Sequence, residues 1–176
     1  ALTADEISNA GRAALALAEA EGLSANFRPI VDGVVQPSHP FMPTAPAQSS
    51  DVPIMIGWNK DEMTIFNAAQ EWFGTLPEAG LAVMGERFGE DGPALIAHYR
   101  EARPDDAPTY IANSAMTARF VYGTYILADQ RARQEDGAPV YMYQLTYETD
   151  TNGGVLRSPH TLDIPFMFDN VEESRI

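Results

Sequence analysis

The run VPIMIGW at residues 52–58 is almost free of polar side chains and ends at Asn59. Such an uninterrupted apolar run is typical of a strand buried on both faces of a mainly parallel sheet. The segment PVYMYQLTY at residues 139–147 is rich in Val and Tyr and predicts a second strand. Two strands separated by helical sequence indicate an α/β fold with a central, mainly parallel sheet flanked by helices. Two strands are too few to bury both faces, so we expect further strands elsewhere in the protein.

Helical signals fill much of the remaining chain. Thr3 and Glu6 have the spacing of a capping box that opens a helix at residues 4–21, and Thr75 with Glu78 predicts a second box. Helical periodicity continues over 61–73 and 114–135, and the last helix is expected to bury a stripe of apolar residues: Met116, Phe120, Tyr122, Tyr125, Ile126 and Leu127.

Four segments follow from these patterns. Residues 27–53, which follow the first helix, form an irregular connector that opens with an expected hairpin turn at Asp32-Gly33 and carries five prolines between residues 36 and 53. Residues 52–62 form a strand with an acidic loop, 63–136 a helical region, and 139–170 a strand followed by a histidine loop. We expect all of residues 1–176 to belong to one catalytic domain.

Charge and composition exclude several function classes. The 176 residues carry 25 Asp and Glu against 11 Lys and Arg, for a net charge of −14, which disfavours nucleic acids and anionic membranes as partners. The chain has no Cys and hence no thiolate nucleophile. No apolar run is long enough to span a bilayer, so a soluble protein is expected, cytoplasmic or secreted.

Two side chains stand where open α/β sheets place their sites, after the carboxyl ends of strands. Glu62 follows the first strand, and His160 lies in a loop after the second. Each residue also has a non-catalytic interpretation. An acid near a helix start interacts favourably with the helix dipole, and loop histidines are commonly solvated. His39 and His98 have no partner within reach by sequence. No zinc-binding His spacing and no calcium loop occur, so we expect neither metal nor cofactor.

The order of Glu62 and His160 along the chain is informative about the class of site. In α/β-hydrolases the triad follows the order Ser, then Asp or Glu, then His, with the acid and the histidine after successive late strands. Glu62 and His160 fit that order, but no GxSxG elbow is present, since the residue between Gly85 and Gly89 at the nucleophile position is Arg87. No HGGG-type oxyanion loop is present either. Both elements would lie upstream.

Several segments resemble the C-terminal half of the type-B carboxylesterases, the family of the bacterial para-nitrobenzyl esterases and the cholinesterases. They are FRPIVDG at 27–33, VPIMIGWNKDE at 52–62, PVYMY at 139–143 and above all SPHTLDIPFMF at 158–168. The matches are collinear. The resemblance implies that the chain is the C-terminal portion of an α/β-hydrolase fold, with the serine in a missing N-terminal part.

The resemblance further implies residue roles. Glu62 is the triad acid and His160 the triad base, Asp61 is structural, and Asp163 with residues 166–168 backs the histidine loop. Trp58, Met63 and Phe66 are candidate pocket residues because they are near Glu62, and Trp58 is bulkier than its counterparts in the family. The implied function is hydrolysis of small-molecule carboxylic esters through an acyl-enzyme. A non-catalytic hydrolase-like binding protein and a helical interaction domain are the alternatives.

Overall fold

The computed structural model describes residues 1–23 and 29–174, which form two compact units at residues 1–39 and 40–176. Each unit is described by itself. The first two residues of the FRPIVDG segment lie outside the described residues, and the hairpin expected around it can be judged only from residue 29 onward.

The first unit contains helix α1, Ala4–Ala20, which begins at the predicted capping box. The Thr3 hydroxyl accepts from the Glu6 N–H, and the Glu6 carboxylate accepts in return from the Thr3 N–H. Further along, Asp32 Oδ1 accepts from the backbone N–H groups of Val34, Val35 and Gln36. The turn at Asp32 is therefore present, but residues 29–39 form no strand, because the carboxylate takes the N–H groups that a strand partner would need.

The second unit is built on two parallel strands, β1 (Ile54–Asn59) and β2 (Val140–Leu145). Ile54 lies opposite Val140 and Asn59 opposite Leu145, so the strands start and end together. The Lys60 N–H donates to the Leu145 carbonyl at 2.9 Å and extends the pairing by one residue. The loops that carry Glu62 and His160 thus leave from the same edge of the sheet.

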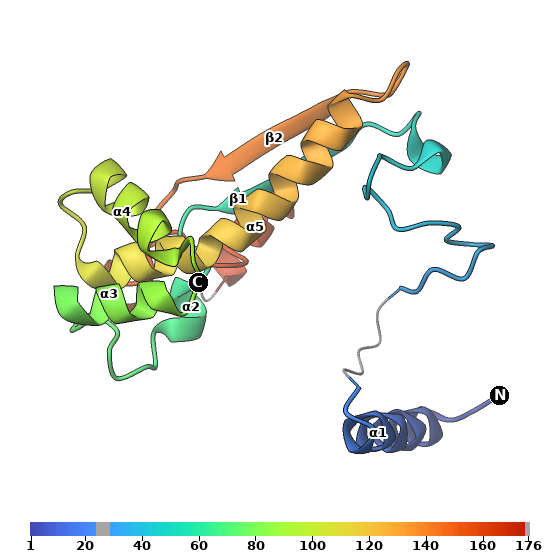
Figure 1. Cartoon of the computed structure of the whole chain (residues 1–176), viewed down its shortest axis with the longest axis horizontal. Helices are drawn as coiled ribbons and strands as arrows, with labels where there is room; N and C mark the ends of the chain where they lie inside the picture. Colours follow the sequence, from blue (N-terminus) through green and yellow to red (C-terminus); the bar gives the residue numbers. More distant parts are fainter. Residues whose placement is uncertain (24–28, 175–176) are drawn as a thin grey trace. The chain divides into compact units, whose positions relative to one another are not determined.

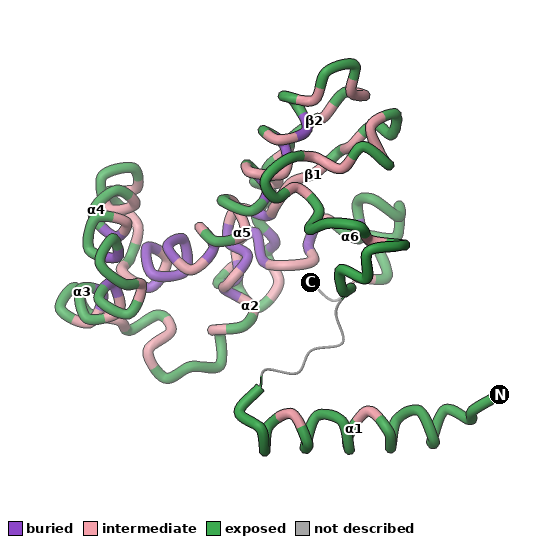
Figure 2. Tube along the Cα trace, turned by 45° about the vertical axis from the view of Figure 1, so that its right-hand side comes forward, coloured by how far each residue is buried: buried purple, intermediate pink, exposed green. Residues whose placement is uncertain are grey.

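Helices pack beside the strands and at their carboxyl end. They are α2 (Thr64–Asn67), α3 (Glu78–Glu86), α4 (Gly92–Ala102), α5 (Pro108–Ala132) and α6 (Asp163–Met167). The long α5 runs along the pair of strands (Figure 1). Its first half closes the core against α3 and α4, where the buried residues gather (Figure 2): Leu81, Ile96, Ile111, Ala112 and Ala115. No helix of the described residues is long and apolar enough to cross a membrane.

Three helix predictions need correction. The segment 61–73 is helical only over α2 and otherwise forms turns. The second capping box does not form: the Thr75 hydroxyl donates to the Glu71 carbonyl, and Glu78 instead pairs with Arg100 at 2.6 Å. Helix α5 starts earlier than predicted, at Pro108, whose fixed φ and missing N–H suit a first helical turn.

The predicted apolar stripe of α5 is wrong in its second half. Tyr122 and Tyr125 are 69% and 55% exposed, whereas small and polar side chains on another face of the helix are buried, including Thr124 and Arg131. The strands are also less buried than predicted. Met55 of β1 is 69% exposed and Tyr141 of β2 is 57% exposed, because each strand has only the other as a neighbour among the described residues.

Arg131 explains why the last part of α5 is polar inside. Its guanidinium, 1% exposed, donates to the carbonyls of Ser49 and Val52 in the segment leading into β1, and to Gln134 Oε1 at 2.6 Å. These bonds tie the helix to the start of the sheet. A charged donor buried with partners stabilises the fold chiefly because its removal leaves those partners unsatisfied.

We therefore expect Arg131→Met to lower the free energy of unfolding by about 2–4 kcal/mol, since two carbonyls and Gln134 lose a charged donor that is itself buried. Arg133→Met is the matched control: the Arg133 side chain is 73% exposed and pairs with Asp129 at the surface. Its effect should stay within about 0.5 kcal/mol. Urea unfolding of both variants measures the difference, and equal losses would contradict a structural role for Arg131.

Candidate active site

The carboxylate of Glu62 is held at the end of β1 by the backbone that precedes it. Its Oε1 accepts from the Asn59 N–H at 2.6 Å, and the residue is only 5% exposed. The turn around it is fixed by Thr64, whose buried hydroxyl donates to the carbonyls of Asp61 and Leu156. A short tight loop thus directs one carboxylate oxygen toward the histidine loop and ties the other to the strand.

His160 approaches this carboxylate from a position 98 residues further along the chain. Its Nδ1 lies 2.5 Å from Glu62 Oε2, and its backbone N–H donates to the Glu62 carbonyl at 3.3 Å. The His160 side chain is 42% exposed, in contrast to that of Glu62 at 7%. With Nδ1 bound to the carboxylate, Nε2 is the ring nitrogen left to exchange a proton with a reacting group.

A pocket of about 310 Å³ opens beside this pair. Of the predicted pocket residues, Trp58 lines it, whereas Met63 and Phe66 are not among its lining residues. Phe66 packs against the imidazole with ring centroids 5.4 Å apart. The rest of the wall comes from α5 and from the histidine loop with α6: Phe120, Thr124, Thr161, Asp163 and Ile164.

Sequence reasoning missed the contribution of α5 to this wall. Phe120 and Thr124 are spaced i, i+4 and therefore share a helix face. The periodicity placed Phe120 on an apolar stripe, but nothing in the pattern indicated that this turn of α5 passes the strand ends. Phe120 also packs beside the His160 ring, at 6.2 Å between centroids.

The histidine loop carries an unusual backbone conformation. Thr161, directly after His160, has φ of 71°. This left-handed region is unfavourable for a β-branched residue, and such strain persists only where surrounding contacts enforce it. Strained residues cluster at functional sites, so the conformation of Thr161 supports the choice of this loop as a candidate functional site.

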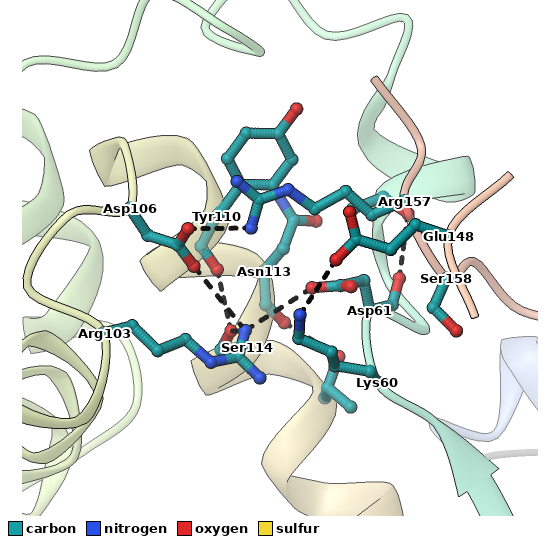
Figure 3. Close-up of polar contacts among 12 residues, drawn as sticks. Lys60, Asp61, Arg103, Asp106, Tyr110, Asn113, Ser114, Glu148, Arg157 and Ser158 are labelled. Carbon is teal, nitrogen blue, oxygen red and sulfur yellow. Dashed lines mark hydrogen bonds and ion pairs between the residues drawn. The ribbon is translucent and has the colours of Figure 1, made fainter. Parts of the chain in front are cut away.

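Asp61 turns away from the histidine. It is fully buried, its Oδ1 lies 3.5 Å from Arg103 Nη1, and its backbone N–H donates to the Ser158 carbonyl. Figure 3 shows how Arg103 also contacts Ser114 and Asp106, and how Asp106 in turn binds Arg157 of the histidine loop at 2.9 Å. The cluster joins the acid loop, α4, α5 and the histidine loop.

The charge balance at Asp61 is unfavourable to its ionised form. Burial raises the pKa of the Asp61 carboxyl, and the nearby charges of Lys60, Arg103 and Arg157 only partly oppose that rise. Its Oδ2 has no hydrogen-bond partner among the described residues. Lys60 itself pairs with Glu148 at 2.9 Å (Figure 3).

The serine nearest to His160 in sequence does not face the imidazole pocket, and the described residues hold no metal-binding group. Ser158, close to His160 in sequence, is fully buried and its hydroxyl donates to the Leu145 carbonyl. No cluster of three or more His, Asp or Glu side chains suited to a metal occurs in residues 1–23 and 29–174.

Parallel strands whose loops bring a carboxylate to an imidazole define an α/β-hydrolase type of site. The chain belongs to the carboxylesterase family, whose model matches residues 1–176. A phenmedipham hydrolase from Pseudarthrobacter oxydans is 30% identical over 148 residues, which are 83% of this chain and 28% of that protein. The resemblance noted in the sequence is thereby confirmed.

A solved structure supports the same conclusion. The crystal structure of the Geobacillus stearothermophilus carboxylesterase EST55 at pH 6.2 matches with a TM-score of 0.60 and 34% identity, over 90% of this chain and 32% of that one. The match and the helix-flanked parallel strands confirm the predicted α/β-hydrolase fold class. The chain spans about a third of the length of these relatives, 28% and 32%.

The raised pKa of Asp61 predicts a pH dependence of stability. Between about pH 4 and the raised pKa, the folded protein binds more protons than the unfolded chain, so the free energy of unfolding falls as the pH rises. Asp61→Asn removes this titration. The stability of Asp61→Asn relative to the natural protein should therefore increase with pH through that window, as urea unfolding at a series of pH values can measure. A relative stability that decreases would mean that the arginines dominate instead.

Proposed function

We propose that the chain supplies the acid and the base of a serine carboxylesterase that hydrolyses carboxylic esters through an acyl-enzyme. The single observation that carries this proposal is the 2.5 Å contact between Glu62 Oε2 and His160 Nδ1. Membership of the carboxylesterase family supports it, as does the pocket that opens at the imidazole. The serine and the oxyanion donors come from a part of the protein outside these residues.

In this mechanism His160 Nε2 takes the proton of the serine hydroxyl as its oxygen forms a bond to the ester carbonyl carbon. The tetrahedral intermediate collapses, the bond to the alcohol oxygen breaks, and the imidazolium returns the proton to the leaving alcohol. Water then repeats the sequence on the acyl-enzyme and releases the acid and the serine. Glu62 holds Nδ1–H throughout and stabilises the imidazolium.

The pocket disfavours anionic esters. Two of its walls carry carboxylates, Glu62 and Asp163, while Trp58, Phe120 and Ile164 provide apolar surface. An anionic substrate would meet like charge at both carboxylates, which is unfavourable. The net charge of −14 on the chain acts in the same direction at longer range.

Replacing Glu62 with Gln tests the acid. The amide has nearly the same shape but carries no charge and disturbs the tautomer of His160, so kcat for an uncharged nitrophenyl ester should fall by about 10³–10⁴-fold in the intact protein. Glu148→Gln is the control, since this surface carboxylate pairs only with Lys60 and should leave turnover unchanged. Turnover by Glu62→Gln equal to that of the natural protein would mean that Glu62 is not the triad acid, and the absence of turnover by the natural intact protein would favour a non-catalytic binding protein.

A second measurement locates the nucleophile. A fluorophosphonate reacts covalently with a serine that a histidine base activates. In the intact protein, peptide mapping should find the label on a serine outside residues 1–176, and His160→Gln should abolish labelling. A label on any serine within these residues, such as Ser114 or Ser158, would show that the assignment of the nucleophile to another part of the protein is wrong.

A further inference from the structure

Asn59, the last residue of β1, contacts Glu62 and the loop that carries His160. Its backbone N–H donates to Glu62 Oε1 at 2.6 Å. Its side-chain Nδ2 donates to the carbonyl of Pro159, the residue before His160, at 2.8 Å, and to Asp163 Oδ1 at 3.2 Å. The residue is 1% exposed, so these bonds form away from bulk water.

The surroundings of the Asn59 amide require a donor. Both groups that its nitrogen meets, a carbonyl and a carboxylate, can only accept. Its own Oδ1 is buried and has no partner among the described residues, which is unfavourable for folding. The unsatisfied oxygen lowers the stability that this amide can contribute. Its nitrogen, however, donates to two acceptors at once, which fixes both of them relative to β1.

Those two acceptors flank the strained part of the histidine loop. Pro159 precedes His160 and Asp163 follows Thr161, whose φ of 71° needs external contacts to persist. The Asn59 side chain therefore binds the loop on both sides of its strained residue. Releasing it would let the backbone relax and carry the imidazole away from Glu62.

Asp163 is fixed from the second strand as well. Its Oδ2 accepts from the Tyr143 hydroxyl at 2.9 Å. Tyr143 lies opposite Gly57 in the sheet, and a Cβ at Gly57 would come within 2.5 Å of the tyrosine ring, so the glycine is what allows the ring to lie there. Both strands thus hold the same loop through one carboxylate.

We propose that Asn59 is a positioning residue that sets the geometry between Glu62 and His160, with Asp163 and Tyr143 as its support. The inference rests on the proposed esterase function and names a residue that acts through the pair rather than on the substrate. The geometry of such a pair must hold to within a fraction of an ångström, since a displacement of about 1 Å can cost about 100-fold in rate.

Asn59→Asp is the test, made in the intact protein. It keeps the shape of the side chain but places a carboxylate against the Pro159 carbonyl and Asp163. Per serine titrated with fluorophosphonate, kcat for an uncharged nitrophenyl ester should fall by about 100-fold while KM changes by less than about threefold. The double variant Asn59→Asp, Asp163→Asn reverses donor and acceptor at one of the two bonds and should recover about tenfold of the loss.

Asn113→Asp is the matched control. Asn113 is a fully buried amide on α5 whose Nδ2 donates to the Thr109 carbonyl at 2.8 Å and whose Oδ1 accepts from Asn67. The substitution disturbs a buried amide of the same kind whose hydrogen bonds lead to α5 and α2 rather than to Glu62 or the histidine loop. It should lower the unfolding midpoint, as Asn59→Asp does, and leave kcat per titrated site within about twofold of the natural value.

The outcomes separate the two proposals. An Asn59→Asp variant that loses stability but keeps kcat per titrated site would overturn the positioning role and leave the esterase function intact. If Asn59→Asp does not fold, Tyr143→Phe decides: it removes only the bond to Asp163, and an unchanged kcat would overturn the role. If Glu62→Gln turns over esters as fast as the natural protein, Glu62 is not the triad acid and the positioning role falls with it. If the intact natural protein neither hydrolyses an ester nor reacts with fluorophosphonate, the esterase function itself is wrong.

Discussion

The parallel pairing of β1 with β2 is the constraint on which the rest of this chain depends. In register from Ile54 with Val140 to Asn59 with Leu145, it brings two carboxyl ends to one edge. The loop that carries Glu62 is short, and hydrogen bonds from Asn59 hold the loop that carries His160. Glu62 and His160 therefore meet although 98 residues separate them. The intervening helices contribute a wall to the pocket through α5, but the strands set the position of the pair.

Two neighbouring carboxylates at this edge, Asp61 and Glu62, have different surroundings. Glu62 is nearly buried yet has both oxygens bound, one by the Asn59 N–H and one by the imidazole. Asp61 is buried with one oxygen unpartnered and an arginine at 3.5 Å, and its pKa is raised by burial. Under the proposed function, the first arrangement suits the carboxylate that orients the imidazole, and the second suits a structural link between loops.

Sequence patterns predicted the features that repeat along the chain or obey local chemistry. The two strands, the capping box at Thr3 and the order of acid and histidine are of this kind, and the comparisons confirm the family. Packing decided the rest. The hydroxyl of Thr75 bonds to its own preceding turn, Arg131 replaces apolar residues inside α5, and Asn59 acts through partners 100 and 104 residues away, which no local pattern encodes.

The register of β1 and β2 also determines which parts of the chain can vary without moving the site. Because Ile54 to Asn59 and Val140 to Leu145 fix where both loops begin, the helices between them can lengthen, shorten or exchange their outer faces without altering the distance from acid to base. Variation among homologous enzymes can therefore accumulate in α3 and α4 and reshape what surrounds the pocket. The distance between Glu62 and His160, which the carboxyl ends of the two strands set, therefore does not depend on these helices.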